Sequence, residues 1–396
     1  MRIRSFVAAL ACAGLVSTAA PAGAALPDAE RARPTPVPTT ATVTVDQLGP
    51  GSVLAVVSRG RFEELRAEGL ARSLEVITPD GDRHPVWSVD VHEDRDGWFR
   101  GDFVLADWRP ELHTALLRVS RGPETDLAVA YDVVTGSARE VPLPRQASTV
   151  GLDPTGRGVL MSTWPAQRRA GRVALLSWAG VRTGIPGRSD NSAIASPDGG
   201  TLVTSEGGAG RWWVVDPVAR TSSSVATPGD CRPVRWLEDG RVLAGCISGK
   251  RAEVQQLRAI ALDGRSTRLG ARHRGEPADN GVGIFGDADV RTVQGRSWYE
   301  SYAGCGGGIL TRQDARGRVR VVRVPGRPDS PATLLGTRGD DLLLALQRTD
   351  CGSWPDRAVL SLFDPVGREE TVLTRLGRRE SWREVLPTTE VRAWIW

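Results

Sequence analysis

Short segments rich in valine, leucine and tryptophan recur along this chain of 396 residues, and turns built on aspartate and glycine separate them. The mean spacing of comparable turns, measured from residue 80 to residue 364, is about 47 residues, and blades of β-propellers repeat every 40 to 50 residues. The seven turns are Pro79-Asp80-Gly81, Asp132 to Gly136, Trp178-Ala179-Gly180, Asp216-Pro217, Asp263-Gly264, Asp314 to Gly317 and Asp364 to Gly367. The repeat therefore predicts an all-β protein.

A second set of turns lies between these marks, and each of them precedes an apolar run of β type. The clearest is Ser196-Pro197-Asp198-Gly199, which is followed by Leu202-Val203 and then by Arg211-Trp212-Trp213-Val214-Val215-Asp216. Long helical periodicity is absent from the sequence. We expect a β-propeller of four-stranded blades over residues 42–396, with seven blades favoured by the spacing and six or eight left open.

The stretch from Ser196 to Asp216 resembles the WD40-like repeat of the TolB propeller proteins, and Glu238-Asp239-Gly240 and Asp153-Pro154-Thr155-Gly156 are looser versions of it. Proteins of the TolB family look like an N-terminal α/β domain followed by a six-bladed propeller. This chain has only a proline-rich stretch and an opening strand before its repeats. The resemblance implies an exported propeller that binds other macromolecules. It brings no catalytic residues with it.

A propeller must close its ring, because an unpaired edge strand invites aggregation. Two β-type runs, Thr42 to Val45 and Val53 to Val57, open the predicted domain, and Glu390 to Trp396 ends it. We therefore expect the first and last strands to share one blade.

The N-terminus has the pattern of a secretory signal. Two arginines precede the apolar run from Phe6 to Val16, and Ala22-Gly23-Ala24 offers a cleavage site, so residues 1–24 are predicted to be removed. Cys12 would carry a lipid in a lipoprotein, but the residues before it make a poor lipobox. Residues 25–41 read as a proline-rich tether. The apolar run is too short for an integral membrane span, and we expect a secreted, extracytoplasmic protein.

Four cysteines remain after removal of the signal: Cys231, Cys246, Cys305 and Cys351. In an exported protein these predict disulfides, for which three pairings are possible. Cys231 with Cys246 is favoured because the two flank a pair of strands, which leaves Cys305 to pair with Cys351. A zinc site is the competing interpretation, but the C-x-x-C spacing is absent.

The charge and the short motifs predict no nucleic-acid partner and no cofactor. A formal net charge of +4 is too small to predict nucleic-acid binding. Gly281 to Gly286 fits the string G-x-G-x-x-G but lacks the strand and helix that a dinucleotide site requires. Asp90, Asp94 and Asp96 form a weak calcium candidate, with an exposed loop as the alternative.

No catalytic residue is assigned. The nucleophile motif G-x-S-x-G does not occur, and the four histidines, His84, His92, His113 and His273, show no pattern that identifies a base. The favoured hypothesis is a non-catalytic module that binds a protein or a glycan in the cell envelope. The alternative is an enzyme that acts on sugars or lactones with carboxylates at the central channel. The sequence gives no oligomeric state.

Overall fold

The computed structural model describes residues 38–60, 70–93, 99–122, 126–145, 147–163, 171–190, 192–249, 254–274, 287–302, 308–314, 316, 318–326, 331–348 and 356–390. The chain divides into two units, Met1–Pro34 and Thr35–Trp396, and every described residue lies in the second. The predicted signal peptide and most of the predicted tether fall outside the described residues and stay predictions. Within the described part of the chain, no helix has the length and apolar character needed to cross a membrane.

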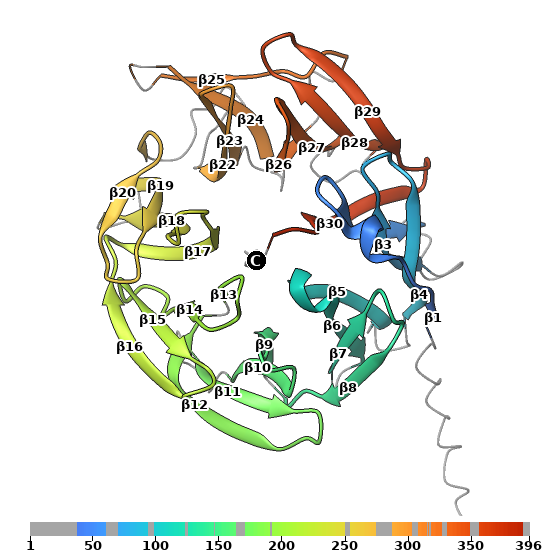
Figure 1. Ribbon diagram of the computed structural model, residues 1–396, viewed down its shortest axis with the longest axis vertical. Helices are drawn as coiled ribbons and strands as arrows, with labels where there is room; N and C mark the ends of the chain where they lie inside the picture. Colours follow the sequence, from blue (N-terminus) through green and yellow to red (C-terminus); the bar gives the residue numbers. More distant parts are fainter. Residues whose placement is uncertain are drawn as a thin grey trace, which may run out of the picture. The chain divides into compact units, whose positions relative to one another are not determined.

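The second unit consists of antiparallel sheets that follow one another around a ring (Figure 1). The largest has nine strands in the order β30-β2-β3-β4-β5-β6-β7-β8, with β1 paired to β4. Its strands are β1 (Thr39–Thr40), β2 (Val53–Arg59), β3 (Leu70–Ile77), β4 (Arg83–Glu93), β5 (Phe99–Arg109), β6 (Thr114–Arg121), β7 (Asp126–Asp132), β8 (Ala138–Pro142) and β30 (Glu380–Pro387). Two short 3-10 helices, η1 (Val45–Leu48) and η3 (Pro110–Leu112), flank its strands.

Five further sheets of four or five strands complete the described part; their strands pair in chain order, except that β21 pairs with β19. They are β9 (Ala147–Leu152), β10 (Gly158–Thr163), β11 (Gly171–Ser177) and β12 (Arg182–Ser189); β13 (Ala193–Ala195), β14 (Leu202–Ser205), β15 (Arg211–Asp216) and β16 (Thr221–Ala226); β17 (Asp230–Trp236), β18 (Val242–Ser248), β19 (Val254–Ile260), β20 (Ser266–Arg268) and β21 (His273–Arg274); β22 (Asp287–Val293), β23 (Arg296–Tyr302), β24 (Gly308–Gln313) and β25 (Val319–Val321); β26 (Ala332–Arg338), β27 (Asp341–Arg348), β28 (Asp356–Asp364) and β29 (Glu369–Arg375). The fold is a β-propeller, as predicted.

The nine-stranded sheet contains two four-stranded groups, β30-β2-β3-β4 and β5-β6-β7-β8. A short bridge joins them, in which His92 and Glu93 of β4 pair with Arg100 and Phe99 of β5. Because this bridge merges the two groups into one sheet, the number of blades stays a prediction.

The last described strand closes the fold by pairing with a strand from the start of the domain. β30 lies antiparallel to β2 from Val53 opposite Pro387 to Arg59 opposite Glu380. The shared sheet was predicted, but the closing strand was placed too late in the sequence. Glu390 lies outside the strand, and residues 391–396 lie outside the described residues.

The opening of the domain also differs from the prediction. Residues 42–44 form no strand, and the 3-10 helix η1 begins at Val45. The side chain of Gln47 accepts a hydrogen bond of 2.8 Å from the Thr44 backbone N–H, and this local bond competes with sheet pairing. The sheet instead begins earlier, at Thr39 and Thr40 inside the expected tether, which pair with β4.

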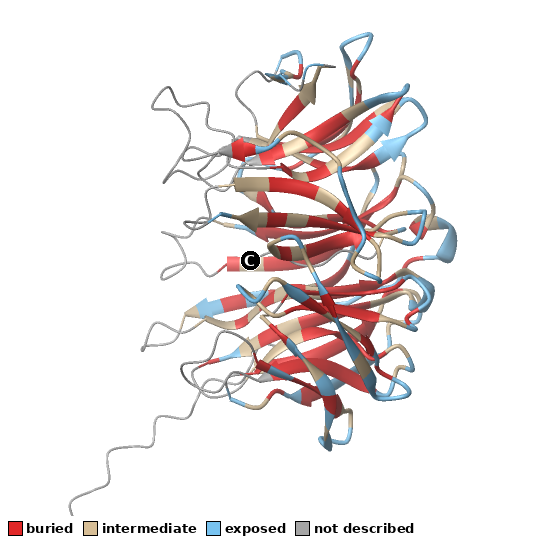
Figure 2. Ribbon diagram, turned by 90° about the vertical axis from the view of Figure 1, so that its left-hand side faces the viewer, coloured by how far each residue is buried: buried red, intermediate tan, exposed pale blue. Residues whose placement is uncertain are grey.

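Both faces of inner strands such as β2 are buried and appear red in Figure 2, whereas outer strands such as β8, β16 and β20 are mostly exposed. On β2, Val53, Ala55 and Val57 pack in one apolar cluster with residues of β26 to β28, while Leu54 and Val56 pack in a second cluster with residues of β5 and β6. Alternate residues of a strand point to opposite faces, so a strand covered on both sides needs an unbroken apolar run. This is why β2 reads as continuous aliphatic sequence.

Polar contacts join neighbouring sheets in addition to this packing. Trp212 Nε1 donates a hydrogen bond of 2.6 Å to the carbonyl oxygen of Cys231, which links β15 to β17. The Gln347 side chain exchanges two hydrogen bonds with the backbone of Trp382, which links β27 to β30. These contacts fix how adjacent sheets sit against one another.

The Ser196-Pro197-Asp198-Gly199 motif forms the turn between β13 and β14. Ser196 Oγ accepts a hydrogen bond of 2.9 Å from the Thr201 N–H, and Gly199 has a positive φ of 71°. A Cβ atom at Gly199 would lie 2.5 Å from Nη2 of Arg109, which only glycine avoids. The motif therefore has a structural role.

Candidate functional site

A row of four side chains crosses the end of the sheet formed by β30, β2, β3 and β4. Glu380 lies opposite Arg59, Arg59 opposite Ala71, and Ala71 opposite Asp90. Residues directly opposite one another on adjacent strands point to the same face of a sheet. The small side chain of Ala71 therefore leaves a gap between the longer side chains of Arg59 and Asp90.

This gap is part of a solvent-open surface cavity of about 660 Å³. The turn that precedes β30 supplies Gly377, Arg378 and Arg379 to its lining, and His92 lies at the end of β4. The remaining lining residues, besides the row itself, are Gly60 and Leu70. Glycine at two positions and alanine at a third keep the space open, and charged side chains form most of its edge.

An ionic network fixes the arginine at the floor of the cavity. Arg59 Nε donates to Glu380 at 2.8 Å, and Arg83 bonds both Glu380 at 2.7 Å and the fully buried Glu75 at 2.7 Å. Burial alone would raise the pKa of Glu380, but the hydrogen bonds from Arg83 and from the Gly377 N–H outweigh it, so the pKa lies below its ordinary value. Glu380 is therefore a carboxylate at neutral pH. About half of the Arg59 side chain, 48 %, stays exposed to a ligand.

The structure places only one of the three calcium candidates. Asp90 is exposed at the cavity, whereas Asp94 and Asp96 lie outside the described residues, so the calcium hypothesis stays untested. Among the described residues there is no group of three or more His, Cys, Asp or Glu side chains that could hold a metal. The glycines of the G-x-G-x-x-G string, 281–286, also lie outside the described part.

The four histidines do not converge. His92 lines the cavity, His84 lies 3.1 Å from the amide nitrogen of Gln47, and His113 ends the helix η3. His273 is buried, and its Nε2 atom lies 3.1 Å from a carboxylate oxygen of Asp287. The sequence pattern did not distinguish among them, and in the structure His92 lines the solvent-open cavity.

Two carboxyl groups, one on the first strand of each four-stranded group in the largest sheet, bond the neighbouring group of strands. Asp107 of β5 accepts the Leu152 N–H of β9 at 2.8 Å, and Glu384 of β30 accepts the Leu105 N–H of β5 at 2.7 Å. Each follows a register shift that leaves the preceding residue, Ala106 or Arg383, without an opposite partner. Such a bulge redirects the next side chain out of the regular alternation.

Burial has the largest influence on the pKa of both carboxyl groups. It raises the pKa of Asp107 to about 6, against the effects of Arg109 and two backbone N–H groups. It raises the pKa of Glu384 to about 7, against the effects of Leu105, Arg383 and Arg72. A raised pKa is a frequent property of catalytic carboxyls. Here each carboxyl accepts a hydrogen bond from a neighbouring group of strands, and this structural contact explains why it is buried.

The stability of the protein should depend on pH through Glu384. Its folded-state pKa lies above the unfolded value, so folding takes up a proton, and stability falls as pH rises from about 5 to 7 at about 1 kcal/mol per pH unit. Glu384→Gln keeps an acceptor for Leu105 and removes this titration. The variant should gain stability relative to the wild type across that range. Urea unfolding at several pH values measures the difference, with the exposed Glu140→Gln as control, and parallel curves for E384Q and wild type would contradict the prediction.

The lining residues of the cavity other than Asp90 and His92 were not singled out from the sequence. Arg378 and Arg379 stand beside each other in a run of charged residues, which is ordinary for an exposed turn. Only the register that places Glu380 beside Arg59, 321 positions earlier, brings them to Asp90. That register depends on residues far apart in the sequence, so no local sequence pattern predicts it.

No protein-family model and no curated protein sequence matches this chain. Solved structures that resemble it include the periplasmic gluconolactonase of Pseudomonas aeruginosa, at 14 % identity and a TM-score of 0.46, covering 84 % of this chain and 98 % of that one. The Swd1 β-propeller domain of Myceliophteria thermophila is 14 % identical with a TM-score of 0.41, covering 80 % and 97 %. Virginiamycin B lyase of Staphylococcus aureus is 12 % identical with a TM-score of 0.38, covering 64 % and 88 %. At these values the likenesses carry no argument about function, and the fold stands on the strand pairing.

Proposed function

We propose that this protein is a non-catalytic binding module outside the cytoplasm, and that the cavity beside Ala71 is its ligand site. We further propose seven blades, with the two four-stranded groups of the largest sheet counted separately. The observation that carries the binding function is the cavity itself. Its volume of about 660 Å³ falls within the range of 300 to 1,000 Å³ that is usual for ligand sites.

The charges of the cavity favour binding over catalysis. A glycosidase needs one carboxyl group that is protonated near neutral pH to act as the acid. Glu380 has the opposite property, because Arg59 and Arg83 hold it as a carboxylate. The two carboxyls with raised pKa, Asp107 and Glu384, are hydrogen-bonded between groups of strands. The buried Cys231–Cys246 disulfide supports an oxidising compartment, in keeping with export.

Filling the cavity should abolish binding. In Ala71→Phe an aromatic ring would occupy the gap between Arg59 and Asp90, and binding to an array of neutral, acidic and phosphorylated glycans should fall at least about tenfold. Ala138→Phe is the matched control, because Ala138 is exposed at the start of β8, away from the cavity. Both variants should melt near the wild-type temperature.

Two results would overturn the proposal. Binding that A71F retains would place the site elsewhere, and the absence of binding to every glycan would remove the function. Turnover of sugar or lactone substrates by the wild type would favour the enzyme hypothesis instead.

A further inference from the structure

We infer that the ligand is an acidic sugar, a ring that carries a carboxylate together with free hydroxyl groups. This inference rests on the proposed function, since it names the chemistry of the same cavity. Three features carry it: a cationic edge held in place, the carboxylate of Asp90 on the opposite edge among the described lining residues, and the distance between them.

The cationic edge is built on a short, fixed turn. Glu380 Oε2 accepts the Gly377 N–H at 2.8 Å, and the Glu380 N–H bonds back to the Gly377 carbonyl oxygen at 3.0 Å. These two bonds close the turn around Arg378 and Arg379, which are both exposed and both line the cavity. A turn closed in this way reduces the conformational entropy that a ligand must remove on binding.

Arg59 extends the same edge toward the floor. Its Nε atom is used by Glu380 at 2.8 Å and its Nη2 atom approaches Glu75 at 3.4 Å, so the guanidinium has a fixed direction. Guanidinium groups bind carboxylates through paired, charge-assisted N–H bonds. Three arginines therefore make this edge a place for an anionic group.

The opposite edge needs hydrogen-bond donors from the ligand. Asp90 is exposed there, and a carboxylate only accepts hydrogen bonds. Adjacent strands are about 4.8 Å apart, so Arg59 on β2 and Asp90 on β4 are separated by roughly 10 Å across Ala71. A sugar ring with a carboxylate at one end and hydroxyls at the other matches both edges at this separation.

Other ligand classes match the cavity less well. An acidic peptide brings carboxylates to both edges and meets repulsion at Asp90. A neutral sugar offers no anionic group to the cationic edge, and inorganic phosphate at neutral pH is too small to reach both edges. The geometry thus selects a ligand that has an anion and neutral donors on one ring.

Calorimetric titration tests the ligand class directly. The probes are digalacturonic acid, the neutral disaccharide of galactose and a short polyglutamate peptide. We expect the acidic sugar to bind about tenfold more tightly than the neutral one, as one or two charge-assisted hydrogen bonds would produce. Raising the salt concentration from about 20 to about 500 mM should weaken its binding severalfold, because salt screens the attraction between partly exposed charges.

Two variants separate the two edges. Arg378→Gln with Arg379→Gln should remove the preference for the acidic sugar and leave the neutral disaccharide unchanged. Asp90→Ala should weaken both sugars by a similar factor of about ten. The matched control is Arg268→Gln with Arg320→Gln, two exposed arginines on β20 and β25 away from the cavity, which should change neither affinity.

The outcomes distinguish failure of the acidic-sugar inference from failure of the proposed binding function. Equal binding of acidic and neutral sugars, both lost in A71F, overturns the inference and keeps the binding function. Tighter binding of polyglutamate than of either sugar also overturns it, in favour of an acidic protein segment. Binding of none of the probes, together with a blank glycan array, removes the proposed function itself.

Discussion

Asp289→Ala should lower the free energy of unfolding by about 3 to 5 kcal/mol, because it removes a buried carboxylate that pairs with two arginines. Asp289 of β22 is 2 % exposed and accepts from Arg235 of β17 at 3.0 Å and from Arg291 of β22 at 3.1 Å. Arg291 in turn bonds Glu390 at 2.6 Å and the carbonyl oxygen of Leu335 on β26 at 3.1 Å. The substitution therefore weakens the contacts among three sheets at once.

Urea unfolding followed by tryptophan fluorescence measures this loss. The control is Glu140→Ala, which removes an exposed ion pair with Arg121 whose partners are 62 % and 40 % exposed. Exposed pairs contribute about 0 to 1 kcal/mol, so the control should unfold close to the wild type. Equal losses for D289A and E140A would show that the buried network does not hold the sheets together.

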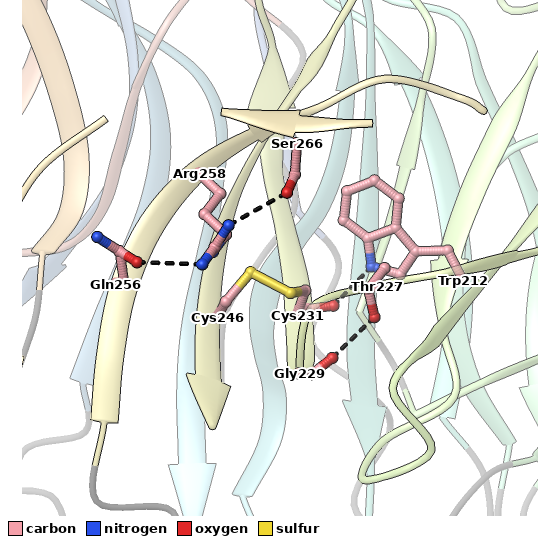
Figure 3. The surroundings of a disulfide bond; sticks show 8 residues. All are labelled: Trp212, Thr227, Gly229, Cys231, Cys246, Gln256, Arg258 and Ser266. Atoms are coloured by element: carbon pink, nitrogen blue, oxygen red, sulfur yellow. Dashed lines mark hydrogen bonds between the residues drawn. A yellow bond between two sulfur atoms is a disulfide. The ribbon is translucent and has the colours of Figure 1, made fainter. Parts of the chain in front are cut away.

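Removing the Cys231–Cys246 disulfide should lower the free energy of unfolding by about 3 kcal/mol, since closing a loop of roughly 15 residues restricts the unfolded chain by about that amount. The two cysteines lie directly opposite each other on β17 and β18, 15 positions apart, and both are buried (Figure 3). The double variant C231A/C246A removes the bridge without leaving a buried thiol.

Unfolding with and without reductant separates this bridge from any second one. Wild-type protein in reductant should approach the stability of C231A/C246A in reductant. Any further loss when the variant itself is reduced reports the predicted pairing of Cys305 with Cys351, which lie outside the described residues. A loss below about 1 kcal/mol in the double variant would contradict the loop-closure account.

The fold was predictable because its turns are local. Asp132 accepts hydrogen bonds from the N–H groups of Val134 and Thr135, two and three residues later, and Asp216 does the same with Val218 and Ala219. An aspartate that bonds its own next residues defines a turn wherever it stands. The spacing of such turns therefore revealed the repeated sheets and the all-β class.

The cavity was not predictable for the opposite reason. It combines Arg59 and Ala71 from the start of the domain with Arg378 and Arg379 from its end. The hydrophobic pattern of β2 does not predict that β30 is one of its partner strands. The 3-10 helix at Val45 was missed because Thr42 to Val45 alternates like a strand, and only the Gln47 side chain decides between the two. Such competitions are settled by single contacts.

The pairing of β2 with β30 sets the order in which the ligand site can form. During synthesis, β2 and β3 emerge first, and the residues from Gly377 to Pro387 emerge more than 300 positions later. Until then the sheet lacks its first strand, and the cavity lacks Arg378, Arg379 and Glu380. A nascent or truncated chain that ends before Gly377 lacks this side of the cavity, so binding at the proposed site would report that the ring has closed.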